Sequence, residues 1–220
     1  MVVRDRDLFP GCFVWECVCV VDDGKSNSRD PYAYPGTDVL INKLDIRDPE
    51  ALKLADADLA YQRLDEMYDD PVTGAFDLDH LRAIHRRLFG DLYAWAGERR
   101  TVAIAKDYSL FALPAYLAQV ADALFGELRR EHYLVGLPKD ELVARLAYYL
   151  GELNALHPFR EGNGRTQREF IRLLALQAGF HVSWEKTSRE EMTQASIEAM
   201  VGRLDPLITL LRHITTALNE

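Results

Sequence analysis

Apolar residues recur every three or four positions along most of the chain, and this spacing places them on one face of a helix. One such stripe consists of Leu117, Val120, Leu124 and Leu128. Repeats of this kind predict helices over residues 48–67, 77–94, 114–132, 138–156, 164–178, 187–200 and 205–218. The chain is therefore expected to be mainly α.

Local signals mark the ends of these helices and one interruption between them. Asp48 followed by Pro49 is a typical helix start, because aspartate caps the first turn and proline needs no N–H partner there. Asp77 is expected to cap the next helix. Residues 100–105 alternate in β fashion, and a turn at residues 107–109 leads back through residues 110–111. We expect one small β-hairpin within a helical domain.

Composition and charge fit one globular domain. The 220 residues suffice for one sizeable core, and the hydrophobic share of 48% is ordinary for a soluble protein. The formal net charge is −9, whereas nucleic-acid-binding domains are more often basic. We therefore expect no direct nucleic-acid binding, although an acidic protein can carry a local basic site.

The first 29 residues differ in character from the rest of the chain. All three cysteines lie there, with no sign of a disulfide framework or a zinc site: Cys12, Cys17 and Cys19. The apolar run over residues 12–21 is interrupted by Glu16 and is too short to span a bilayer. We expect residues 1–29 to form a poorly ordered extension and linker, or a short pairing strand. A single domain over residues 30–220 should follow, in a cytoplasmic protein without a membrane segment.

One twelve-residue segment between two predicted helices concentrates the candidate chemistry. It reads His157, Pro158, Phe159, Arg160, Glu161, Gly162, Asn163, Gly164, Arg165, Thr166, Gln167 and Arg168. A helix that begins at Gly164 or Arg165 would present unpaired N–H groups and a positive dipole end to an anion. The glycines would let the backbone approach a phosphate closely.

The charged side chains of this segment suit a polyphosphate. Arg165 and Arg168 share a helix face, so both guanidinium groups can fork onto phosphate oxygens. Arg172, one turn later, is interpreted as a solvated or ion-paired residue. Glu161 could hold Mg²⁺ against the phosphates. His157 could accept a proton from an attacking hydroxyl group, which predicts a nucleotide-using transferase.

The segment resembles the signature of the Fic family, His-Pro-Phe-x-(Asp/Glu)-Gly-Asn-Gly-Arg-x-x-Arg, with every specified position filled. Residues 81–89 and 93–98 also look like the first core helix of these proteins, and residues 100–111 look like their β-hairpin flap. Residues 30–36 look like the start of the short bacterial toxin-type members. The resemblance implies a Fic-type helical bundle of about seven or eight helices with a hairpin flap. It also implies transfer of AMP from ATP to a hydroxyl group of a target protein.

The resemblance implies a role for each motif position. His157 would be the general base and Glu161 the carboxylate that holds Mg²⁺. The nucleotide-binding positions would be Phe159, Gly162, Asn163, Gly164, Arg165 and Arg168. The two glycines and the asparagine form the anion cradle in this interpretation, and the two arginines hold the β- and γ-phosphates. The phenylalanine is a buried wedge that fixes the loop.

Two other functions stay open. The related Doc branch phosphorylates its targets and carries lysine where this chain has Gly164, so the glycine favours AMP transfer. Phosphoryl or other nucleotidyl transfer by the same site is the alternative among enzymes. The alternative that is not an enzyme is a nucleotide-binding interaction module, and the intact His157 and Glu161 argue against it.

The resemblance also implies a target protein. The flap edge from Val102 to Lys106 is the candidate docking edge for a target segment, which would add to it as a strand. Targets of the kind implied are bacterial proteins such as subunits of DNA gyrase and topoisomerase IV.

A small antitoxin is the second implied partner. Family members are commonly restrained by a helix with the pattern (Ser/Thr)-x-x-x-Glu-(Gly/Asn), whose glutamate pairs with the second motif arginine, here Arg168. Thr187 with Glu191 matches the spacing, but an amphipathic surface helix explains this pair better. Thr216 with Glu220 matches at the end of the chain. We predict a separate antitoxin, with a C-terminal inhibitory helix cut short as the alternative.

Overall fold

The computed structural model describes residues 30–106 and 109–218. Seven α-helices form most of this part of the chain. They are α1 (Pro49–Asp69), α2 (Leu78–Phe89), α3 (Leu117–Arg130), α4 (Lys139–Leu156), α5 (Asn163–Gln177), α6 (Arg189–Met200) and α7 (Asp205–Ile214). The mainly α prediction is therefore confirmed. None of the helices described is both long and apolar enough to cross a membrane.

Short elements connect these helices. The strands form two antiparallel pairs, β1 (Ala105–Lys106) with β2 (Ser109–Leu110), and β3 (Phe180–Val182) with β4 (Thr215–Ala217). Three 3₁₀ turns complete the described elements: η1 (Pro114–Tyr116), η2 (His132–Leu134) and η3 (Trp184–Lys186). The expected extension over residues 1–29, with its cysteines, lies outside the described residues.

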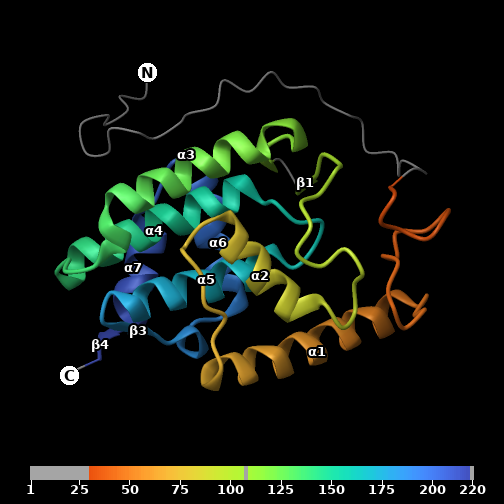
Figure 1. Cartoon of the computed structure of the whole chain (residues 1–220), viewed down its shortest axis with the longest axis horizontal. Coiled ribbons are helices and arrows are strands. Elements are labelled where there is room, and N and C mark those ends of the chain that lie inside the picture. Colours follow the sequence, from red (N-terminus) through yellow and green to blue (C-terminus); the bar gives the residue numbers. More distant parts are fainter. Residues whose placement is uncertain (1–29, 107–108, 219–220) are drawn as a thin grey trace.

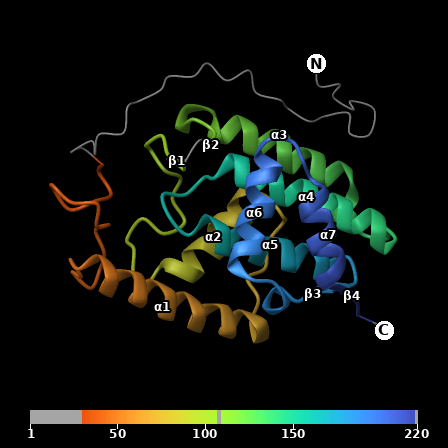
Figure 2. The same ribbon diagram turned by 180° about the vertical axis from the view of Figure 1, so that it is seen from behind.

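Helix α5 lies in the middle of the molecule and packs against α4 and α2 (Figure 1). Its central residues Phe170, Ile171 and Leu174 have no exposed surface. In both views α1 lies along one edge of the molecule (Figures 1 and 2), and it packs against α2. The helix that follows the motif loop is thus packed between α2, which precedes it by about 75 positions, and its sequence neighbour α4.

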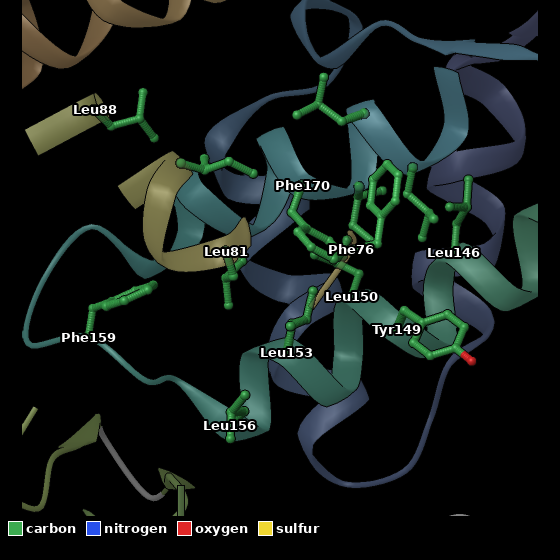
Figure 3. Close-up of a cluster of buried hydrophobic side chains, with 14 of the residues drawn as sticks. Phe76, Leu81, Leu88, Leu146, Tyr149, Leu150, Leu153, Leu156, Phe159 and Phe170 are labelled. Carbon is green, nitrogen blue, oxygen red and sulfur yellow. The ribbon is translucent and has the colours of Figure 1, made fainter. Parts of the chain in front are cut away.

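The motif is anchored in the hydrophobic core by one aromatic side chain. Phe159 is 1% exposed, and its ring points from the loop before α5 into the cluster that contains Leu81 and Leu88 of α2 (Figure 3). Burying a side chain of this size contributes about 1.5–3 kcal/mol. The wedge role expected of Phe159 matches this position.

The hairpin is shorter than its sequence pattern predicted. Of the described residues before the turn, Ala105 and Lys106 pair with the returning strand, and residues 100–104 are not part of a strand. The reason is tertiary: the carbonyl groups of Val102 and Ala112 accept hydrogen bonds from the Arg100 side chain.

Other helix ends also differ from the prediction. Helix α2 ends at Phe89 rather than near residue 94, because the chain turns at Gly90 and the Leu92 carbonyl accepts a hydrogen bond from Lys43 N–H. The helix expected over residues 114–132 begins as the 3₁₀ turn η1. The final helix stops at Ile214, and its expected last turn is strand β4, which pairs with residues far away in sequence.

Candidate active site

The loop between α4 and α5 begins at His157, which adopts a left-handed backbone conformation with φ 44° and ψ 61°. The following proline disfavours a right-handed helical conformation at this position. A non-glycine residue in this region costs on the order of 1–3 kcal/mol unless its surroundings hold it there. The His157 N–H still donates to the Leu153 carbonyl at 3.0 Å, so the residue ends α4.

Two of the described contacts orient the imidazole of His157. Its Nδ1 lies 3.1 Å from the Asn154 carbonyl oxygen, and its ring stacks on Phe111 at 3.8 Å. A carbonyl oxygen can only accept, so Nδ1 carries the proton of the neutral ring and Nε2 carries the lone pair. This tautomer is the one that a general base acting through Nε2 requires.

Asn163 closes the loop that follows. Its Oδ1 accepts from Phe159 N–H at 2.9 Å, and its Nδ2 donates to the Phe159 carbonyl at 2.8 Å. The side chain is 3% exposed and is therefore committed to the loop. Any contribution of Asn163 to an anion cradle must come from its backbone N–H.

A buried histidine on α2 supports the loop from the other side. The ring of His85 stacks on Phe159 at 3.9 Å, its Nε2 donates to the Glu161 carbonyl at 2.9 Å, and its Nδ1 accepts from Gly97 N–H at 2.8 Å. Burial lowers the pKa of His85 to about 4, so the ring is neutral and its tautomer is set by these two bonds.

The glycines of the motif differ in environment. Gly162 caps α5 with φ 80°, and a Cβ there would lie 2.4 Å from the Phe89 ring. Gly164 is exposed, and its Cβ position lies 3.4 Å from Nη1 of Arg168. The first helical bond of α5 runs from Thr166 N–H to the Gly162 carbonyl. By helix geometry, the N–H groups before it are left for an external acceptor.

The three arginines on this face of α5 have different partners. Arg165 forms an ion pair with Asp56 of α1, and its guanidinium lies 4.5 Å above the Phe89 ring. Arg172 is buried and pairs with Glu169 at 2.7 Å, as its ion-paired interpretation predicted. Within the described part of the chain, the guanidinium of Arg168 has neither an ion pair nor a hydrogen bond. Burial lowers the pKa of Arg168, and the positive charges of Arg165 and Arg189 lower it further.

Glu161 is the carboxylate nearest in sequence to this helix end. Its side chain is exposed, and Oε1 accepts from Gly162 N–H at 3.0 Å. No group of three or more potential ligands in the described ranges could hold a metal ion by itself. One carboxylate beside an anion site is the donor set that Mg²⁺ uses when phosphate oxygens and water complete its shell.

Comparison with known proteins identifies the family. The profile of the Fic/DOC family matches residues 75–175. The "Probable protein adenylyltransferase Fic" of Escherichia coli is 38% identical over 200 residues, which cover 91% of this chain and 99% of that protein. The chain belongs to the Fic/DOC family. The "Protein adenylyltransferase VbhT" of Bartonella schoenbuchensis is 48% identical over 189 residues, but this chain covers only 40% of its length.

Two similar solved structures share the fold and hold nucleotides. The N-terminal Fic domain of a Bartonella quintana effector protein, solved with bound ADP, is 31% identical. It has a TM-score of 0.79 over 84% of this chain and 94% of that one. The BepC protein of Bartonella tribocorum, solved with bound AMPPNP, is 29% identical with the same TM-score, over 84% of this chain and 96% of that one.

Three residues that support the Fic motif were not singled out from the sequence. They are Asp56, His85 and Arg100. His85 falls on the apolar stripe of α2 with Leu81 and Leu88, and a histidine on such a stripe could have been questioned. Asp56 and Arg100 carry no comparable signal, because each contacts the motif only through the tertiary fold.

The two candidates for a built-in inhibitory pattern have structural explanations. Glu191 is exposed and forms a capping box with Ser188 at the start of α6. It therefore serves the helix end, as the surface-helix interpretation predicted. Thr216 lies in strand β4 rather than on a helix, and Glu220 lies outside the described residues.

Proposed function

We propose that this chain is a Fic-type protein adenylyltransferase that moves AMP from ATP to a hydroxyl group of a target protein. One observation carries the proposal: the guanidinium of Arg168, which has no ion pair or hydrogen bond among the described residues, lies near the helix end that follows the imidazole of His157. Relatives bear the name protein adenylyltransferase, and solved Fic domains hold ADP and AMPPNP.

The proposed chemistry is an in-line displacement at the α-phosphorus. Nε2 of His157 accepts the proton of the target hydroxyl as the hydroxyl oxygen bonds to phosphorus, and pyrophosphate leaves with the electrons of the broken P–O bond. Arg165 and Arg168 would hold the β- and γ-phosphates, together with the backbone N–H groups of the α5 N-terminus. Positioning and charge neutralisation would supply most of the rate.

Glu161 would hold Mg²⁺ in this proposal. The ion, when bound, would neutralise phosphate charge and orient the leaving group. The exposed carboxylate fits this use, since the bond to Gly162 N–H occupies only one of its oxygens in the described structure.

We also propose two protein partners. A target segment would pair with the flap, for which the described strand edge at Ala105 and Lys106 is support. Subunits of DNA gyrase and topoisomerase IV are the first candidates to test. A small antitoxin would supply a carboxylate to Arg168, which has no carboxylate partner among the described residues. The cytoplasm, where ATP is available, is the proposed location.

The test is label transfer in a bacterial lysate. ATP labelled at the α-phosphate should mark one or more proteins, whereas ATP labelled at the γ-phosphate should not. His157→Ala should lower the rate by about 10²–10⁴-fold or more. His213→Ala, an exposed histidine on α7, is the matched control and should retain the rate.

Other outcomes of this test would favour one of the alternative functions or bear on the antitoxin. Label from the γ-phosphate alone would show phosphoryl transfer, and ATP binding without any label transfer would favour the interaction module. Strong self-modification by the chain alone would support a separate antitoxin.

A further inference from the structure

The side chain of Arg100 is buried, and it has no carboxylate partner among the described residues. Arg100 is 2% exposed, and within that part of the chain its guanidinium donates only to backbone carbonyl groups. Burial of an unpaired cation is costly, and it lowers the pKa of Arg100 to about 10. The parts of the chain that the hydrogen bonds of Arg100 join can explain why a buried cation stands at this position.

The three carbonyl groups come from three separate places. Nε donates to the His157 carbonyl at 2.8 Å, Nη1 donates to the Val102 carbonyl at 2.7 Å, and Nη2 donates to the Ala112 carbonyl. Val102 precedes β1, and Ala112 follows β2. One planar fork therefore joins the entry of the flap, the exit of the flap and the first residue of the motif.

Backbone hydrogen bonds reinforce the same junction. Arg100 N–H donates to the Pro158 carbonyl at 2.9 Å, and Ala112 N–H donates to the Ala155 carbonyl at 3.0 Å. Phe111, which directly precedes Ala112, stacks on the His157 ring. The flap base and the end of α4 thus form one hydrogen-bonded unit, beside the loop that leads to α5 (Figure 1).

We propose that Arg100 is a positioning residue that couples the flap to the imidazole of His157. The His157 backbone lies in an unfavourable region with φ 44°, and the bond from Arg100 Nε fixes the direction of its carbonyl. A target segment that docks on the flap is thereby held in register with the proton acceptor. This inference rests on the proposed function, because it assigns Arg100 to the same reaction.

Three variants test this coupling. Arg100→Met removes the charge and all three donors, whereas Arg100→Lys keeps the charge without the planar fork. Arg99→Met is the matched control, because Arg99 is the exposed neighbour. The rate of label transfer from α-labelled ATP into lysate proteins should fall about 100-fold in Arg100→Met at saturating ATP. It should fall less in Arg100→Lys and stay unchanged in Arg99→Met.

The ATP dependence distinguishes positioning from nucleotide binding. The ATP concentration at half-maximal rate should stay within about twofold of the parent value in Arg100→Met, since the proposed phosphate contacts lie on α5. A large rise in that concentration, with the saturating rate unchanged, would contradict the coupling.

A titration of His157 by NMR gives a readout that does not depend on activity. Removal of the nearby positive charge should raise the imidazole pKa in Arg100→Met, whereas Arg100→Lys should lie nearer the parent. Parent-like label transfer and parent-like titration in folded Arg100→Met would overturn the proposal. If Arg100→Met does not fold, label transfer by Arg100→Lys decides, and a parent-like rate in that variant would overturn the proposal. If the parent transfers no AMP, the proposed function fails, and the titration still decides whether Arg100 acts on His157.

Discussion

Asp56 of α1 forms an ion pair with Arg165 of α5, although 109 positions separate the two residues in the chain. Arg165 also donates through Nη1 to the Asp56 backbone carbonyl at 3.3 Å. Asp56 is 8% exposed, and Tyr93 lies beside it, with its pKa raised by burial and then by the Asp56 charge. Helix α1, which lies outside the matched residues 75–175, therefore orients the first arginine of the motif.

Asp56→Asn should destabilise the fold and weaken ATP binding. The change leaves Arg165 partly buried without a counter-charge, which should lower the free energy of unfolding by about 3 kcal/mol. The ATP concentration at half-maximal rate should rise because the guanidinium loses its fixed position. Urea unfolding and label transfer measure the two effects. Asp58→Asn, on the exposed side of the same helix, should show neither effect, and equal results for the two variants would contradict the prediction.

His85 should make the fold less stable in acid. Its pKa is about 4 in the fold against 6.5 for the free side chain, so the unfolded chain binds a proton more strongly than the folded chain does. The free energy of unfolding should therefore fall as the pH is lowered from 6.5 to 4, by up to about 3 kcal/mol. His85→Gln can still donate and accept but does not titrate. Urea unfolding at several pH values should show a shallower acid slope in this variant, and an unchanged slope would refute the prediction.

Glu152 should make the fold less stable as the pH rises, which is the opposite of the effect of His85. It has neither a hydrogen bond nor an ion pair within residues 30–106 and 109–218, and burial followed by the charge of Glu127 raises its pKa to about 7. The protonated carboxyl group of Glu152 therefore contributes to the free energy of unfolding below pH 4.5, and this contribution is lost as the pH rises through 7. Glu152→Gln should raise the free energy of unfolding at pH 8 by up to about 3 kcal/mol and change it little at pH 4.

The control for this prediction lies on the same helix. Glu141→Gln, at an exposed position of α4, should change the free energy of unfolding by less than about 1 kcal/mol at either pH. A Glu152→Gln variant that is no more stable than the parent at pH 8 would show that the carboxylate is solvated or paired in solution.

Gly162→Ala should disrupt the motif loop through a steric clash. Gly162 has φ 80°, and the added Cβ would lie 2.4 Å from the Phe89 ring. Gly136→Ala is the matched control, because Gly136 has φ 84° and no atom of the described residues lies within 4 Å of its Cβ position. The control should lose about 1 kcal/mol from backbone strain, and Gly162→Ala should lose at least about 3 kcal/mol. Label transfer should fall about 100-fold only in Gly162→Ala, and parallel losses in both variants would exclude the clash.

The helices were largely predictable because their signals are local. Asp48 caps α1 and accepts from Ala51 N–H at 2.8 Å, as the sequence predicted. Helix α4 ends at Leu156, and its C-cap His157 precedes Pro158, so the reason for this helix end involves neighbouring residues alone. Strand β4 was missed because its partner β3 lies more than thirty positions away, so its hydrogen bonds leave no local pattern. The length of the hairpin was overestimated from the alternation of residues 100–105. That pattern cannot show that the buried Arg100 side chain donates hydrogen bonds to the carbonyl groups of Val102 and Ala112.

The motif by itself determined the family, the residue types available for chemistry and the helix end that could bind an anion. Those features depend on residues within twelve positions of one another, so they can be predicted from the sequence without knowledge of the tertiary structure. Only the tertiary structure decided that Asp56 holds Arg165 and that His85 and Arg100 hold the loop. It also decided that Arg168 has no carboxylate partner within residues 30–106 and 109–218. Each of these contacts joins parts of the chain that meet only when the core packs, and burial then sets the strength of the electrostatic interactions between them.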